Sequence, residues 1–93
     1  MIVGVARIKL FISESRSLKD KRRVVQSLKT RIRNGFNVSV SEVDALENRQ
    51  IAVLGIAQVC NSGKYVSGTF EKIRNLINRS PLAQMVSCEI ESY

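Results

Sequence analysis

The side chains most suited to chemistry in this sequence are cations crowded into one segment near its start. Residues 1 to 34 hold ten Lys or Arg and two acids, whereas residues 35 to 93 hold five and six, so the net charge of +7 falls in the first third of the chain. This asymmetry favours a polyanionic partner, with nucleic acid ahead of an anionic membrane. The residues expected to bind nucleic acid are Arg16, Lys19, Lys21, Arg22, Arg23, Lys29 and Arg33.

A single helix is expected to carry nearly all of these cations. Ser17 is a favourable N-cap with Asp20 three residues later, and Asn34 followed by Gly35 is a helix stop, so a helix is predicted from 17 to 34. Its apolar residues fall on one side and the cations on the other, except Lys21, whose side chain is expected to reach out of the apolar sector to solvent. Cations near a helix N-terminus are repelled by the positive end of the helix dipole. A bound anion would relieve this repulsion. A solvated helix face is the alternative interpretation.

Groups that perform catalysis are sparse. The chain has no histidine, which removes the commonest general base and the usual partner of a nucleophilic Ser or Cys. Gly63 and Gly68 match no phosphate-binding glycine pattern. Cys60 and Cys88 are too few for a zinc site. We therefore expect no enzymatic activity, no metal and no cofactor.

Hydrophobic periodicity divides the chain into six elements of a single domain, residues 1–93. Strands are predicted at 2 to 12, 36 to 43, 49 to 60 and 82 to 91, and helices at 17 to 34 and 64 to 79. The order βαββαβ with right-handed crossovers predicts an α+β fold, the ferredoxin-like sandwich, whose four-stranded antiparallel sheet has the order 4-1-3-2 and both helices on one face. Cys60 and Cys88 would then be separated by the first strand, roughly 9.6 Å apart, and remain free thiols.

The helix-free face of this sheet is expected to form an interface. The third strand is apolar on both sides, which predicts a homodimer through that face. The fourth strand should turn Met85 outward and place Glu89 and Glu91 beside Arg7 and Lys9 as cross-strand ion pairs. The face lacks the aromatic side chains that read bases in the RNA-recognition motif.

Targeting and membrane signals are missing from the sequence. Met1 leads directly into a strand-like run, no apolar stretch approaches the roughly 18 residues that span a bilayer, and the basic helix lacks the apolar flank of an interfacial helix. We therefore expect a cytoplasmic protein that does not bind membranes.

One block of sequence carries a family resemblance. The run SLKDKRRVVQSLKTRIRNGFNVSVSEVD, with VLGIA in the third strand, resembles the YlxP-like family of small bacterial proteins, a domain of unknown function. The resemblance covers nearly the whole chain and implies a ferredoxin-like fold and a role near RNA or the ribosome. Relatives often carry a Gln-Asp-Leu-Trp-Gln-Arg-like run where this chain has residues 45 to 50 without tryptophan, so no contact by that aromatic is carried over.

Two functions follow from these observations. The first is an RNA-binding or ribosome-associated accessory factor whose first helix contacts phosphate backbone by charge, without base readout. The alternative is an oligomeric scaffold or regulatory domain that binds an acidic protein or a small anionic ligand and not nucleic acid.

Overall fold

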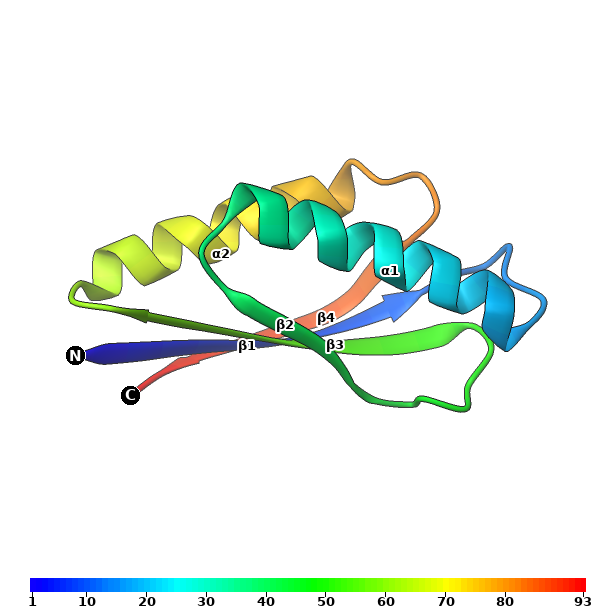
Figure 1. The fold of residues 1–93 in the computed structure, drawn as a ribbon, viewed down its shortest axis with the longest axis horizontal. Helices are drawn as coiled ribbons and strands as arrows, with labels where there is room; N and C mark the ends of the chain where they lie inside the picture. Colours follow the sequence, from blue (N-terminus) through cyan, green and yellow to red (C-terminus); the bar gives the residue numbers. More distant parts are fainter.

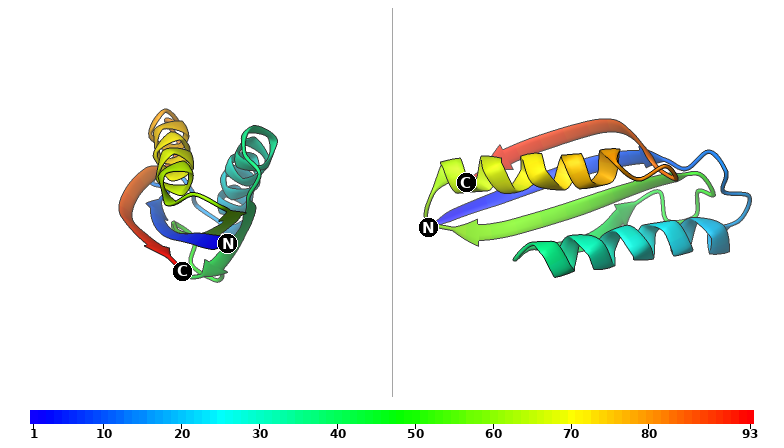
Figure 2. Two further views of the ribbon diagram at one scale, coloured as in Figure 1. Left: turned by 90° about the vertical axis from the view of Figure 1, so that its left-hand side faces the viewer. Right: turned by 90° about the horizontal axis from the view of Figure 1, so that it is seen from above.

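The computed structural model describes residues 1–93 as one layer of strands covered by one layer of helices. Four antiparallel strands form a sheet in the order β2-β3-β1-β4, which is the predicted 4-1-3-2 order read from the other edge. Both helices lie on the same face of the sheet (Figure 1) and run in opposite directions (Figure 2). The fold is the predicted ferredoxin-like sandwich. Its elements are β1 (Ile2–Phe11), α1 (Leu18–Gly35), β2 (Ser39–Asp44), β3 (Ile51–Cys60), α2 (Gly63–Asn78) and β4 (Gln84–Ser92).

The core lies between the sheet and the two helices. Alternate residues of β1 and β3 point toward the helices and pair across the register, as Ile8 does with Leu54. Each fully buried side chain of this kind contributes about 1.5 to 3 kcal/mol. The helices contribute Val25, Leu28 and Ile32 from α1, and Val66, Phe70, Ile73 and Ile77 from α2.

A glycine on β1 allows α2 to approach the sheet closely. A Cβ atom at Gly4 would lie 2.3 Å from Cγ1 of Val66 and 3.1 Å from Cε2 of Phe70. Any side chain at this position would therefore push α2 away from β1. Across the register, Gly4 pairs with Gln58 of β3, so α2 approaches the sheet closely next to Gln58.

The second, third and fourth strands begin two or three residues later than predicted, at Ser39, Ile51 and Gln84, and one side chain faces the other way. The second strand begins at Ser39 rather than at 36, because the Val38 N–H donates to Phe36 O at 3.0 Å and turns the chain before the ladder begins. The prediction that Met85 faces outward was wrong. A β-bulge in β4 opposite Lys9 and Leu10 brings Met85 to the core side, where it packs against the hydrophobic core.

A second bulge, in β2, changes which face its last residues occupy. Glu42 pairs with Leu54, which points toward the helices, whereas Asp44 pairs with Val53 on the opposite face. In a regular strand residues 42 and 44 would share a face, but the bulge makes Val43 an extra residue, so Glu42 and Asp44 oppose adjacent residues of β3. Glu42 therefore points toward the helices and Asp44 toward the helix-free face.

The ion pair on the helix-free face is not the predicted one. Arg7 Nη2 lies 2.8 Å from Asp44 Oδ2, and neither Glu89 nor Glu91 lies within 4.0 Å of a cation. Asp44 is better placed because its carboxylate is anchored by the Ala45 N–H, which donates to Oδ1 at 2.7 Å. This donation first, and the Arg7 guanidinium second, lower the pKa of Asp44 below its ordinary value.

The two cysteines are free thiols, as predicted. Cys60 pairs with Ile2 and Cys88 with Ile8, so they lie on opposite sides of β1 and six residues apart along it, which is roughly 20 Å at about 3.3 Å per residue. The expected separation of roughly 9.6 Å was therefore too short, because it counted only the spacing between strands. Burial raises the pKa of the Cys88 thiol. Neither helix combines the length and the apolar character that crossing a membrane requires.

Candidate nucleic-acid interface

The first turn of α1 is built by reciprocal capping. The Ser17 hydroxyl accepts from the Asp20 N–H at 3.0 Å, and Asp20 Oδ2 accepts from the Arg16 N–H at 3.0 Å. At the other end, the Phe36 N–H donates to Ile32 O at 3.0 Å. The predicted limits of the helix are confirmed to within one residue. Asp20 is the one acid on α1, and because it serves the cap it forms no ion pair with the cations beside it.

The solvent side of α1 forms a single basic surface, which we call the outer face of α1. All of its cations are exposed, and none lies within 4.0 Å of a carboxylate. The surface has no acidic and no aromatic residue. Its residues are Lys19, Arg22, Arg23, Gln26, Ser27, Thr30 and Arg31. Four cations held on one rigid helix without acids between them attract polyanions.

Arg31 was missed by the sequence-based prediction. The predicted strip of cations followed Lys19, Arg22, Lys29 and Arg33 along one flank of the helix, and Arg31 lies on the other flank. A signal for it was available, because Arg31 lies four residues, or about one turn, after Ser27 on the polar side of the helix. In the structure Arg31 is exposed and borders the outer face of α1.

The prediction that Lys21 binds nucleic acid was wrong, because this side chain is fully buried. Its Nζ lies 2.9 Å from Glu42 Oε2. It also donates to the carbonyl oxygens of Ala45 at 2.9 Å and Ile51 at 3.1 Å. Glu42 Oε2 accepts no hydrogen bond of regular geometry, so charge attraction joins the two groups. Lys21 therefore does not reach solvent and binds the loop between β2 and β3.

The physical reason lies in that loop. Ala45 adopts a left-handed backbone conformation with φ of 58°, which is strained for a residue with a Cβ atom. Its carbonyl oxygen accepts from the Asn48 N–H at 3.0 Å as well as from Lys21. An ammonium group has three donors and no acceptor, so it suits a buried cluster of carbonyl oxygens. The partners lie 24 to 30 residues away in sequence, where a helical pattern cannot reveal them.

The remaining predicted residues divide by their accessibility. Arg16 is exposed just before the helix, and Lys29 is half-buried. Arg33 is exposed, but its Nη2 donates to Val40 O at 3.0 Å and so ties the helix to the edge strand β2. The structure thus brings Lys19, Arg22 and Arg23 together on the outer face of α1, with Arg16 just before it and Lys29 and Arg33 toward β2.

Comparisons with known proteins place the chain in a family whose activity is not described. The profile of a family described as "Protein of unknown function (DUF503)" matches residues 3–90. The "Uncharacterized protein YlxP" of Bacillus subtilis (strain 168) is 32% identical over 80 residues, which cover 86% of this chain and 87% of the relative.

Similar solved structures include two designed proteins. De novo designed protein Foldit4 has a TM-score of 0.55 at 16% identity and matches 100% of this chain and 97% of its own. The de novo designed protein LFR1 1, described as having a ferredoxin fold, has a TM-score of 0.58 at 9% identity, with 98% and 86% covered. At these identities the likeness shows the fold alone. The sequence matches show more, because they span nearly the whole chain, and the protein belongs to the DUF503 family that includes YlxP.

Proposed function

We propose that this protein is a cytoplasmic RNA-binding accessory factor, associated with RNA or the ribosome, that lays the outer face of α1 along a phosphate backbone. The observation that carries the proposal is that four cations, Lys19, Arg22, Arg23 and Arg31, are exposed on one helix with no carboxylate within 4.0 Å. Free cations that no internal acid neutralises are available to phosphates.

The mechanism is positioning by charge. An 18-residue helix spans about 27 Å at 1.5 Å per residue, which is long enough to contact several successive phosphates. Binding then releases counterions from the nucleic acid, and the affinity depends strongly on salt. Since α1 has no aromatic side chain, its outer face offers no surface on which bases can stack, and contacts with phosphates alone carry no sequence information.

A second candidate is a homodimeric scaffold or regulatory domain that binds an acidic protein through the same cations. The specific observation that favours it is the helix-free face, where Val59 is 62% exposed and Val43 is 49% exposed. Association of two copies through this face would remove that apolar surface from water. A homodimer through the helix-free face is compatible with either function, since α1 lies on the other side of the sheet (Figure 2).

The test compares two double variants that each remove two exposed cations. Arg22→Ala with Arg23→Ala should flatten the dependence of log affinity on log salt by about 1.4 units on single-stranded RNA, at about 0.7 per lost phosphate contact. Arg74→Ala with Arg79→Ala, on and just after α2, is the matched control and should leave the slope unchanged. Fluorescence anisotropy with labelled RNA between about 50 and 200 mM salt measures the slope for each double variant.

The same experiment can reject the proposal. Equal slopes for both double variants would mean that RNA responds to net charge rather than to α1. Absence of RNA binding by the parent protein at the lowest salt would favour the scaffold, which predicts that the cells' acidic proteins, and not ribonuclease-sensitive material, co-purify with it.

A further inference from the structure

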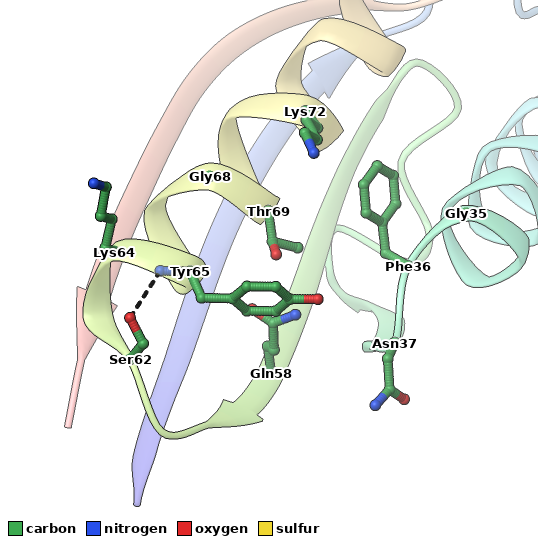
Figure 3. Close-up of a pocket in the computed structure, with 10 residues that line it drawn as sticks. All are labelled: Gly35, Phe36, Asn37, Gln58, Ser62, Lys64, Tyr65, Gly68, Thr69 and Lys72. Carbon is green, nitrogen blue, oxygen red and sulfur yellow. Dashed lines mark hydrogen bonds between the residues drawn. The ribbon is translucent and has the colours of Figure 1, made fainter.

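A pocket of about 520 Å³ lies at the end of the molecule where α1 finishes and α2 begins. We call it the interhelical pocket and define it by Phe36, Gln58, Lys64, Tyr65, Thr69 and Lys72. Figure 3 shows Tyr65 projecting from α2 toward the side of the pocket formed by Phe36, with Gln58 rising from β3 at its floor. None of these residues belongs to the outer face of α1, so this site is distinct from the proposed RNA-backbone surface.

The floor of the pocket contains polar groups that the fold leaves without partners. Four buried residues of the protein are polar or charged. Two of them are satisfied, since Ser15 donates to Arg49 O at 2.6 Å and Lys21 is bonded as described above. The other two, Gln58 and Thr69, are 4% and 7% exposed and line the interhelical pocket. Neither side chain forms a hydrogen bond within the protein, and Gln58 Oε1 is buried without any partner.

An unpaired amide at a core position opposes stability. Leaving a buried polar group without a hydrogen bond is destabilising, and an apolar side chain of the same size at residue 58 would avoid that loss. Such groups in a folded protein call for an explanation. A ligand that completes the hydrogen bonds of Gln58 and Thr69 supplies one.

The walls and mouth of the pocket indicate the chemistry of the ligand. Lys72 is exposed and turns its amine toward the pocket, whereas the Lys64 amine turns away from it (Figure 3). None of the ten lining residues is acidic, so the site favours an anionic group. The N-terminus of α2, at Gly63, adds partial positive charge. Tyr65 is 61% exposed, so its ring is free to stack on a flat ligand.

We propose that the interhelical pocket binds one nucleotide, either a free nucleoside monophosphate or an unpaired residue of an RNA strand. The base edge pairs with the Gln58 amide and the Thr69 hydroxyl, the base ring lies against Tyr65, and the phosphate contacts Lys72. Only the RNA form of this inference rests on the proposed function. It adds to that function a means of reading a base, which the outer face of α1 lacks.

A phosphate ion by itself does not fit the pocket as well. Phosphate oxygens accept hydrogen bonds from Lys72, but a tetrahedral hydrogen phosphate ion does not present a donor and an acceptor in one plane to match the Gln58 amide. The amide presents a donor and an acceptor side by side, so the matching partner carries one of each. The Watson–Crick and Hoogsteen edges of bases have this arrangement and are the edges that proteins read in single-stranded RNA.

The inference is tested by titrating the full-length protein with AMP, GMP, CMP and UMP while recording amide NMR spectra. At least one nucleotide should cause saturable shifts at the pocket, including the Gln58 side-chain amide, and should bind about tenfold or more tightly than ribose 5-phosphate. Gln58→Leu should reduce that nucleotide's affinity to the level of ribose 5-phosphate while the melting temperature stays the same or rises. Tyr65→Ala, at an exposed position, gives a second test of lost affinity should Gln58→Leu fail to fold.

Three results would overturn the nucleotide assignment: no saturable shift, equal binding of ribose 5-phosphate and every nucleotide, or unchanged nucleotide binding by Gln58→Leu and Tyr65→Ala. An oligoribonucleotide separates the two sources of the ligand. Displacement of the bound mononucleotide by the oligomer identifies an RNA residue as the ligand, and no displacement identifies the free nucleotide.

The two proposals fail separately. Arg22→Ala with Arg23→Ala should weaken RNA binding and leave mononucleotide binding unchanged, because those residues lie outside the pocket. Gln58→Leu should leave the salt slope of RNA binding unchanged. If the parent protein binds RNA but no mononucleotide, only the pocket proposal is rejected. If it binds a mononucleotide but no RNA, only the proposed RNA-binding function is rejected.

Discussion

The two ion pairs of this protein have nearly the same length and opposite surroundings. Lys21 Nζ lies 2.9 Å from Glu42 Oε2, with side chains 0% and 13% exposed, whereas Arg7 Nη2 lies 2.8 Å from Asp44 Oδ2, with side chains 52% and 62% exposed. Water screens the second pair and not the first. The distance between the charged atoms therefore does not by itself determine how much an ion pair contributes to stability. The burial of the pair determines it.

The same contrast exists within one turn of α1. Lys21 is buried and binds the loop between β2 and β3. Its neighbours Arg22 and Arg23 are exposed and form no ion pair. The buried cation fixes the position of α1 on the fold, and this fixes which way the exposed cations of the same helix face. A residue that the sequence groups with a binding surface can thus be part of the scaffold that presents the surface.

Removal of the buried cation should have the largest effect on stability. We expect Lys21→Ala to lower the free energy of unfolding by about 3 kcal/mol, because Glu42 is left as a mostly buried unpaired charge and the loop carbonyls lose their donor. Urea unfolding followed by circular dichroism measures the loss. Lys19→Ala, which removes an exposed lysine from the same helix, is the control and should change stability by less than about 0.5 kcal/mol.

A double variant separates the charge from the packing. Lys21→Met with Glu42→Leu removes both charges and keeps apolar volume, so it should recover about half or more of the Lys21→Ala loss. Recovery is incomplete because the carbonyl oxygens of Ala45 and Ile51 remain without their donor. Equal stability of Lys21→Ala and the parent protein would contradict the contrast between the two pairs.

Self-association would remove the difference in burial between the pairs. If the helix-free face forms the proposed homodimer, the Arg7–Asp44 pair becomes enclosed as well. Val59→Glu should then weaken dimerisation by about tenfold or more, or about 1.4 kcal/mol, while the monomer remains folded because Val59 is 62% exposed. Sedimentation equilibrium measures both proteins. A parent protein that is monomeric at micromolar concentration would reject the homodimer.

Loss of the exposed α1 cations should leave the fold intact. Arg22→Ala with Arg23→Ala should change the free energy of unfolding by no more than about 0.5 kcal/mol, because both side chains are exposed and lack ion-pair partners. Thermal and urea unfolding measure this independently of RNA. A marked loss of stability would assign these arginines a structural role like that of Lys21.

The exposed pair should give the smallest effect, and it should depend on pH. The lowered pKa of Asp44 means that its carboxylate stabilises the fold above the ordinary value of about 3.9 and that this contribution disappears as the pH falls through the lowered value. Asp44→Asn should therefore be slightly less stable than the parent protein near neutral pH and should converge with it in acid. A difference that persists in acid would mean that the substitution acts through packing instead.

The sequence by itself determined the architecture of this protein. Strand alternation, helical periodicity, the N-cap at Ser17 and the helix stop at Asn34 and Gly35 are local patterns, and with the right-handed crossover rule they leave essentially one sheet order. The prediction of free thiols at Cys60 and Cys88 followed from that order. Lys19, Arg22 and Arg23 on the outer face of α1 were found in the same way, although Arg31 was missed, because a helical period separates solvent from core without knowledge of the partner elements.

Only the tertiary structure decided how particular polar side chains are used. Two β-bulges change the face of Met85 and Asp44, and a bulge depends on the ladder with a neighbouring strand rather than on local pattern. Lys21 is buried because carbonyl oxygens from a distant loop surround it. The interhelical pocket likewise joins the end of α1, the floor of β3 and the start of α2, so its unpaired Gln58 becomes visible only when three elements meet.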